Sequence, residues 1–159
     1  MGTGFRWVRP PEEMAKAIGA YGKKVLAAVH AVAVYNGQAM QNDARRNAPW
    51  QDRTGNARGG LFFAVDGFGL APVVGQVRVS AGDQPGGEAT VTESGGPNRL
   101  IIILGHTMFY GRWLETSNGA KFAVVMSTIE AHLPQLEQML QGLFTGGLSA
   151  RAGSMVSVV

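Results

Sequence analysis

Three histidines and one short group of ionisable side chains are the first places in this sequence to look for chemistry. His30, His106 and His132 lie far apart, and none has another histidine or a carboxylate three or four residues away. That spacing is what brings two metal ligands onto one face of a helix. We therefore expect no metal site and no cofactor.

His106, Tyr110 and Glu115 lie within ten residues of one another, and such side chains act as a general acid and base when they reach the same substrate. We favour a structural interpretation, in which Tyr110, Trp113 and Leu114 are buried packing residues and Glu115 forms an ion pair or a cap. The sequence has neither the Gly-x-Ser-x-Gly of a serine nucleophile nor the Gly-x-x-x-x-Gly-Lys of a phosphate-binding loop. A protein that is not an enzyme is the expectation.

A basic segment around Trp50 is the best candidate for contact with nucleic acid, because cationic side chains with an interleaved aromatic ring suit a phosphate backbone. Its cationic residues are Arg45, Arg46, Arg53 and Arg58. Asp43 and Asp52 offset half of this charge, and the whole chain has a formal net charge of +3. Ion pairs across a subunit interface explain the segment at least as well as DNA does, so both interpretations stay open.

The elements that must position these residues begin with a long helix over residues 11–46. Prolines open it, two glutamates follow in its first turn and two arginines stand in its last turn, which matches the helix dipole. A bend or break is expected near Asn36-Gly37, and the helix must end before Ala48-Pro49. One face is apolar, with residues at alternating spacings of four and three: Met14, Ile18, Tyr21, Val25, Ala28, Val32, Tyr35 and Ala39.

Between residues 61 and 115 the pattern changes to short segments rich in β-branched and aromatic residues, separated by glycine, proline, asparagine and aspartate. No helical stretch separates them, so we expect an antiparallel sheet of about four or five short strands. The expected strands are Leu61 to Val65, Val73 to Ser80, Ala89 to Thr92 and Leu100 to Leu104, with Tyr110 to Glu115 as one more strand or a structured loop.

A second helix is expected over residues 124–144, packed on the sheet or on another subunit, with an interior Pro134 that predicts a kink or a restart. Residues 145–159 are expected to be a flexible tail. Residues 1–144 then form a single α+β domain: a long N-terminal helix, an antiparallel sheet and a C-terminal helix. The second helix carries an apolar row of Ile129, Leu133, Leu136, Leu140 and Leu143.

The composition adds three expectations. The chain has no cysteine, so disulfides are excluded, and this composition fits a protein that assembles in a reducing cytosol. Charged residues make up 16% of the chain against 45% hydrophobic residues, which indicates that neighbouring subunits cover part of the apolar surface. We expect no signal peptide and no stretch long and apolar enough to span a membrane.

Residues 44–61 resemble a segment of small tailed-phage proteins known as tail-completion, head-tail joining, neck or minor tail proteins. In that family a long first helix ends in Ala-x-x-x-Ala-Pro, and Thr-Gly follows closely; later come a tyrosine, an aromatic or aliphatic pair, a glutamate and a closing helix. Ala57 and Thr116-Ser117-Asn118 depart from the family pattern. The matching positions are Ala44, Ala48, Pro49, Thr54 and Gly55, then Tyr110, Trp113, Leu114 and Glu115.

The resemblance implies a structural subunit of the virion, assembled in the host cytoplasm, that forms a ring at the head-tail junction around the channel for the genome. Its implied partners are further copies of itself, expected as a hexamer, the connector and tail-tube proteins, and DNA bound without sequence specificity; no membrane is implied. The alternative is a small nucleic-acid-binding module that uses Arg45 to Arg58. Apart from the family, Pro49 should end the helix, and Thr54-Gly55 should turn the chain into the sheet.

Overall fold

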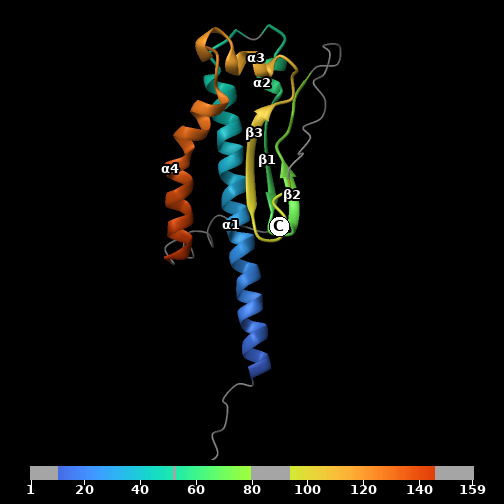
Figure 1. Ribbon diagram of the computed structural model, residues 1–159, viewed down its shortest axis with the longest axis vertical. Coiled ribbons are helices and arrows are strands. Elements are labelled where there is room, and N and C mark those ends of the chain that lie inside the picture. The colour runs from blue at the N-terminus through green and yellow to red at the C-terminus, as the bar shows by residue number, and fades with distance from the viewer. Residues whose placement is uncertain (1–10, 52, 80–93, 146–159) are drawn as a thin grey trace, which may run out of the picture.

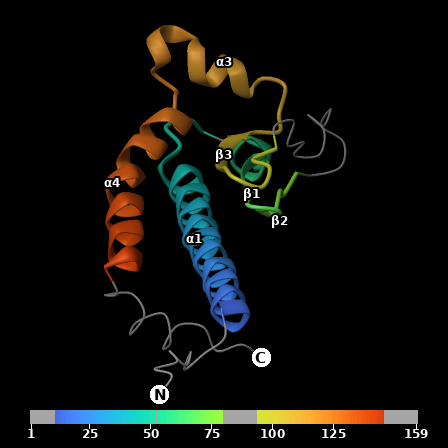
Figure 2. The same ribbon diagram turned by 60° about the horizontal axis from the view of Figure 1, so that its bottom comes forward.

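The computed structural model describes residues 11–51, 53–79 and 94–145. α1 lies between the sheet and α4, so the molecule has three layers (Figure 1, Figure 2). The α+β class, the long first helix, the antiparallel sheet and the closing helix are as predicted. In chain order the elements are α1 (Pro11–Asn47), α2 (Asn56–Gly59), β1 (Leu61–Gly67), β2 (Leu70–Val74), β3 (Leu100–His106), α3 (Gly111–Thr116), a single 3₁₀ turn (Asn118–Ala120) and α4 (Val125–Phe144).

α1 is one uninterrupted helix of 37 residues, so the break predicted near Asn36-Gly37 does not occur. Asn36 is completely buried, and its side-chain amide donates to the carbonyl of Val32 at 3.0 Å. Gly37 faces Phe63 of β1, and a Cβ added at this glycine would collide with the phenyl ring. Gly37 therefore lowers the intrinsic helix propensity without interrupting the helix, and it lets α1 lie close to the sheet.

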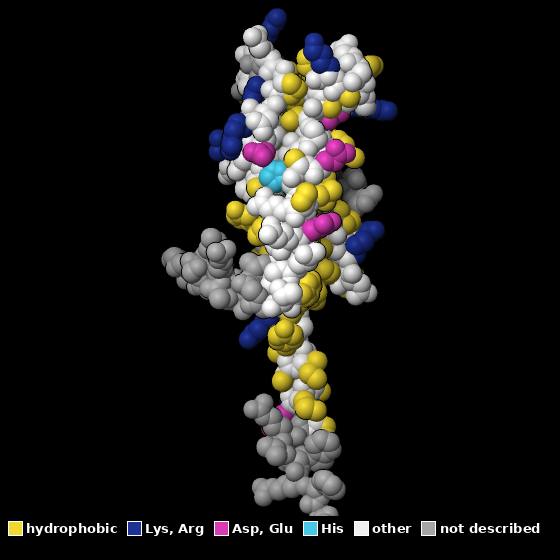
Figure 3. All heavy atoms as spheres, turned by 90° about the vertical axis from the view of Figure 1, so that its left-hand side faces the viewer, with side chains coloured by type: hydrophobic (Ala, Val, Ile, Leu, Met, Phe, Trp, Pro, Cys, Tyr) yellow, Lys and Arg dark blue, Asp and Glu magenta, His cyan; other side chains and the backbone are white. Residues whose placement is uncertain are grey.

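The first half of α1 projects beyond the sheet and beyond α4 (Figure 1). Residues 11–24 are all exposed, and Met14, Ile18 and Tyr21 keep 51%, 67% and 69% of their surface in solvent. Hydrophobic side chains follow the projecting helix in the space-filling view (Figure 3). By length and composition alone α1 is also apolar enough to cross a membrane, and 11% of its apolar window is buried. The expectation that no stretch reaches this apolarity was therefore wrong.

The described residues form a sheet of three strands in the order β2-β1-β3, with both pairs antiparallel, fewer than the four or five predicted. β1 and β3 pair without interruption from Leu61 opposite His106 to Gly67 opposite Leu100. β2 ends at Val74, so it covers only the start of the predicted strand from Val73 to Ser80. The predicted strand from Ala89 to Thr92 lies outside the described residues, and Tyr110 to Glu115 belongs to a helical segment instead of the predicted strand or structured loop.

The core lies between β1 and the inner half of α1. Alternate residues of β1 contribute Leu61, Phe63 and Val65, because side chains two apart on a strand share a face. From α1 they meet Ala33, Met40 and Ala44, which are between 0% and 2% exposed. The small alanines bring the helix backbone near the sheet.

α4 packs chiefly against α1, and not on the sheet as predicted. His132 and Thr128 are buried on α4, and His132 Nε2 lies 2.9 Å from Asp43 Oδ2 of α1. The helix runs on through Pro134, so of the predicted kink or restart the restart does not occur, and α4 changes direction along its length (Figure 1). The apolar row of α4 meets β3 only at an apolar groove of about 260 Å³, lined by Met40, Leu100, Ile102, Leu104, Ile129, Leu133 and Leu136. The predicted tail lies, from residue 146 onward, outside the described residues.

Candidate functional site

The predicted turn motif lies between the end of α1 and the start of β1. α1 ends at Asn47, just before Ala48-Pro49, and Ala44 and Ala48 are both buried. Gly55 has a φ of 81°, and Thr54 Oγ1 accepts a hydrogen bond from the N–H of Asn56 at 3.4 Å. The roles predicted for Pro49, Thr54 and Gly55 are confirmed, since they end the helix and shape the turn that enters the sheet.

Arg45 clamps three stretches of backbone together. Its Nε donates to the carbonyl of Arg58 at 3.0 Å. One terminal nitrogen of the same guanidinium donates to the carbonyls of Gly59, Leu61 and Gln76 at 3.1, 2.8 and 2.6 Å. A charged, planar donor group suits this arrangement because it can serve several carbonyls at once.

These contacts explain why β2 is short. Gln41, one helical turn before Arg45, donates its side-chain amide to the carbonyls of Leu61 and Gln76 at 2.8 and 2.9 Å. Two neighbouring backbone segments thus bond to side chains of α1 in place of the regular ladder between strands. Direct backbone contact returns at Arg78, whose N–H donates to the carbonyl of Gly59 at 2.9 Å.

Arg58 holds the end of α1 from the opposite direction. Its terminal nitrogens donate to the carbonyls of Arg45, Ala48 and Trp50 at 2.6, 3.1 and 2.9 Å. The side chain of Arg45 therefore donates to the backbone carbonyl of Arg58, and the side chain of Arg58 donates to that of Arg45. The prediction that these two side chains face DNA or a neighbouring subunit does not fit their contacts, which make them internal braces of the turn.

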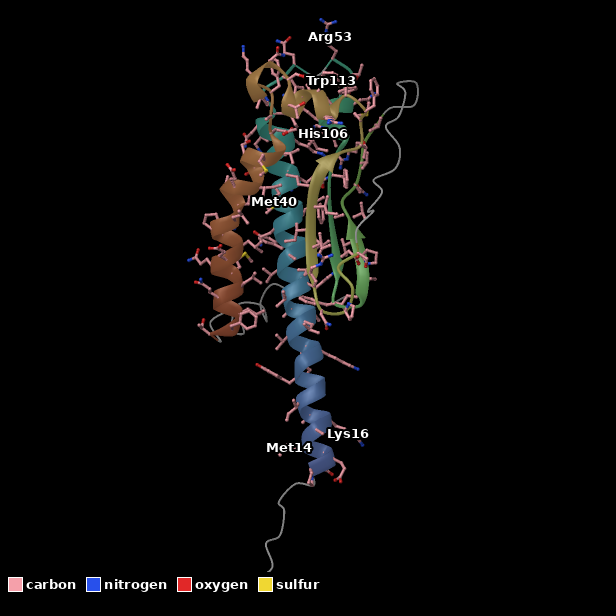
Figure 4. The ribbon with its side chains drawn as sticks, in the orientation of Figure 1. Met14, Lys16, Met40, Arg53, His106 and Trp113 are labelled. Carbon is pink, nitrogen blue, oxygen red and sulfur yellow. The ribbon has the colours of Figure 1, made fainter. Side chains whose placement is uncertain are left out.

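The other half of the predicted basic segment lies at the surface. Arg46 is 72% exposed, and its Nη1 stands 3.6 Å from Asp43 Oδ1. Arg53 is exposed and lies at the end of the molecule farthest from the projecting helix (Figure 4). Trp50 packs on the core, with its ring centroid 5.8 Å from that of His106. Its indole therefore does not interleave with arginines as a surface for stacking bases.

A polar hollow of about 570 Å³ lies beside the clamp. Three guanidinium groups and four amide side chains line it, with no carboxylate among them, and Arg78 is exposed. Burial and the charge of Arg78 lower the pKa of Arg45, and Asp43, outside the lining, offsets part of the positive charge through its ion pair with Arg46. The lining residues are Gln38, Gln41, Asn42, Arg45, Arg46, Gln76 and Arg78.

Sequence reasoning missed Arg78 and Gln41. A signal for Arg78 was present, because Gln76 and Arg78 alternate with valines and glycine and so share the polar face of the predicted strand. No local signal distinguished Gln41, since a glutamine on a long helix is usually solvated. Its burial follows from the carbonyls that it reaches across the chain.

Glu115 caps the first turn of α4. Its carboxylate oxygens accept hydrogen bonds from the N–H groups of Val124 and Val125 at 3.0 to 3.3 Å, and a negative charge suits this end of the helix dipole. The cap predicted for Glu115 is confirmed. His106 Nε2 lies 3.6 Å from Glu115 Oε1, and the imidazole is 5% exposed. The two lie near each other, but 3.6 Å is longer than a hydrogen bond, and the enclosed imidazole leaves little room for a substrate.

Burial lowers the pKa of His106, and the charge of Glu115 acts in the opposite direction. Trp50 and the helical segment after residue 110 surround the ring, and a Cβ added at Gly111 would collide with the His106 side chain. The neutral imidazole therefore suits this position better than the charged one.

The aromatic residues of the second motif are unequally buried. Tyr110 and Leu114 are half-buried, whereas Trp113 is 70% exposed. Burial of Trp113 was a wrong prediction, because residues 111–116 form α3 and Trp113 lies on an exposed part of this short helix. Trp113 lies at the opposite end of the molecule from the projecting half of α1 (Figure 4).

No family model, curated protein or solved structure matches this chain. Within residues 11–51, 53–79 and 94–145, no group of three or more histidine, aspartate or glutamate side chains could hold a metal ion. What the molecule does is inferred from the contacts of its described residues.

Proposed function

We propose that this chain is a structural subunit of a tailed-phage virion, which forms a ring at the head-tail junction around the DNA channel and has no catalytic step of its own. The observation that carries the proposal is that three residues of the motif that resembles the phage family hold the backbone in place. Pro49 follows the end of α1, Gly55 turns the chain and Glu115 caps α4. Side chains occupied in this way shape a surface and do not act on a substrate.

Uncovered apolar surface supports an assembled state. Met14, Ile18 and Tyr21 at one end and Phe109 and Trp113 toward the other are all more than half exposed. Soluble monomers rarely leave such side chains in contiguous patches. β2 and β3 are edge strands among the described residues, and strand edges are also covered in closed assemblies. A ring of identical copies, six in the form that the family implies, would bury these surfaces.

The test is to remove the gene from a phage that carries it and to examine the lysate by electron microscopy. We expect filled heads and separate tails, with joined particles restored when the wild-type protein is supplied in trans. Mass spectrometry of purified wild-type virions should detect the protein. Infectious particles that form normally and lack this protein would overturn the proposal.

A second candidate function, a nucleic-acid-binding module, is supported by the polar hollow beside Arg45. Arg46 and Arg78 line it and are exposed. They differ from the set identified in the sequence because Arg45 and Arg58 bond backbone carbonyls. In a ring the same hollow would suit contact with passing DNA, so binding by the isolated subunit is the measurement that separates the two functions.

For this second function, Arg46→Ala with Arg78→Ala should weaken binding to duplex DNA and reduce the slope of log affinity against log salt by about 2. Lys16→Ala with Lys23→Ala removes the same charge from the projecting half of α1 and serves as the control. Equal losses from both pairs, or no binding by the wild type at low salt, would contradict a phosphate site in the hollow.

A further inference from the structure

The projecting half of α1 has the heptad pattern of a coiled coil. Its apolar residues recur at spacings of four and three, so alternate members occupy the a and d positions. Ile18, Val25 and Val32 are the a residues, and all three are β-branched, as a positions of parallel coiled coils favour. The d residues are Met14, Tyr21 and Ala28.

Four of these residues, Met14, Ile18, Tyr21 and Val25, form what we call the α1 seam. Three of them are more than half exposed, and Val25 is half-buried. Val32, the next a residue, is buried within its own chain, whereas Tyr35, farther along the same stripe, is 57% exposed. The inner half of α1 therefore buries a face beside the stripe, and the stripe itself is mostly uncovered in the outer half.

The face opposite the seam has charged side chains among small residues, with Leu26 as its one large apolar residue over residues 11–26. Lys16 and Lys23 occupy f positions, the ones farthest from a coiled-coil interface, and Figure 4 shows Met14 and Lys16 together near the far end of the helix. The e and g positions flanking the seam are mostly small, so helices could approach closely over a wide apolar strip. These flanking residues are Ala15, Ala17, Gly22, Lys24, Val29 and Ala31.

The projecting helix is poorly suited to stand alone. Gly19 and Gly22 have open space where a Cβ would be, so no close packing accounts for them, and both lower helix propensity. A solvated helix of this length is marginal even without glycine. Burial of the seam by other helices supplies what the isolated segment lacks.

We propose that the projecting halves of α1 from several copies of this chain pack together as a parallel bundle through the α1 seam. The proposal that copies associate through the seam rests only on the heptad pattern and the exposure of α1. Its parallel direction rests on the proposed ring, because rotation about one axis points every helix the same way.

A bilayer fits the seam less well than other copies of the chain. Lys23 and Lys24 interrupt the middle of the projecting half, and charges there are costly inside a membrane. Apart from Leu26, the large apolar side chains of residues 11–26 also lie on this stripe, and glycine, alanine and charged residues make up most of the other faces, whereas a spanning helix is apolar on all sides.

A single introduced cysteine tests the bundle directly, because the chain has none of its own. In full-length protein, Ile18→Cys should give disulfide-linked dimers under mild oxidation with copper phenanthroline. Residues at equivalent a positions of neighbouring parallel helices face each other across the interface. Lys16→Cys, on the outer face, should give few or none. Oligomers that fail to cross-link through Cys at position 18 would overturn the parallel bundle, and equal cross-linking of both variants would overturn the seam.

Sedimentation of the full chain provides the second test. Wild type should be oligomeric, and Ile18→Glu with Val25→Glu should reduce the mass to the 16.8 kDa monomer while the thermal transition of the body persists. Lys16→Glu with Lys23→Glu should leave the oligomer intact. If the wild type is monomeric until the chain is cut after Thr145, then residues 146–159 cover the seam. If the protein floats with lipid vesicles and the seam substitutions abolish this, then a membrane covers it. Either result overturns the proposal.

These measurements are separable from the phage role. A cross-linked bundle formed by a protein that is absent from virions would keep the inference and overturn the proposed function. A virion protein that stays monomeric in solution and does not cross-link within particles would do the reverse.

Discussion

The two halves of α1 share one helical repeat and have opposite surroundings. The inner half buries polar side chains, with Asn36 and Gln41 at 0% exposure, while the outer half exposes apolar ones, with Ile18 and Tyr21 near 70%. Hydrophobicity alone would have placed the burial in the wrong half. Gln41 is buried where it donates to the carbonyls of Leu61 and Gln76, and Asn36 where it donates to the carbonyl of Val32 in α1 itself. Partner carbonyls, as much as apolarity, thus decide what a helix buries.

Replacing Arg45 with alanine should produce the largest effect on this comparison. The change leaves the carbonyls of Gly59, Leu61 and Gln76 with fewer donors, and we expect the free energy of unfolding to fall by about 3 kcal/mol. Urea denaturation measures it. The neighbouring Arg46→Ala removes an exposed ion pair and should cost at most about 1 kcal/mol. Equal losses would mean that Arg45 is not a clamp.

A methyl group at Gly37 should come next. Alanine is the better helix former, yet its Cβ would collide with the ring of Phe63, so Gly37→Ala should lower the free energy of unfolding by about 1–3 kcal/mol. Thermal denaturation followed by circular dichroism would show the change. A stabilised variant would indicate that α1 and β1 are not in close contact at this point.

The stability of the packed part of the molecule, in which His106 lies on β3, should depend on pH. Burial places the folded pKa of His106 below the ordinary value of 6.5, so the unfolded chain takes up a proton first as the pH falls. Stability should therefore be lost below about pH 6.5 and level off once the folded imidazole is protonated. Denaturation at pH 7.5 and pH 5 measures the loss. His106→Gln should reduce it, whereas an unchanged pH dependence would show that His106 is not the cause.

The smallest effect is expected from Gly22→Ala in the outer half. Nothing lies within 4 Å of its missing Cβ, so alanine should strengthen the local helix by up to about 1 kcal/mol and leave global unfolding nearly unchanged. Hydrogen exchange of the amides over residues 18–26 would report the gain as slower exchange. A loss of protection would contradict an uncovered glycine at this position.

Local chemistry made the ends of α1 and the turn after it predictable. Proline, threonine and glycine act on their own backbone, so Pro49, Thr54 and Gly55 could be assigned before any fold was known. For Glu115 an ion pair or a cap was predicted, and the structure shows the cap. Both helices were located correctly for the same reason, since an apolar repeat is a local property.

Long-range contacts made the rest unpredictable. Arg45 and Arg58 have the charge of a nucleic-acid site, and only the folded chain shows that backbone carbonyls occupy them. The shortness of β2 depends on Gln41, which lies 35 residues away from Gln76 in the sequence. Trp113 was assigned to the interior as an aromatic packing residue of a strand or structured loop, whereas α3 leaves it exposed.

The separations in sequence of these contacts also imply an order in time. Arg58 bonds carbonyls 8 to 13 residues behind it, so the turn after α1 can close soon after residue 58 leaves the ribosome. The contact between His132 and Asp43 spans 89 residues and must wait until nearly the whole chain has been made. A growing chain therefore has a braced α1 long before α4 is available to cover it, and nascent copies on the same messenger RNA could meet during that interval.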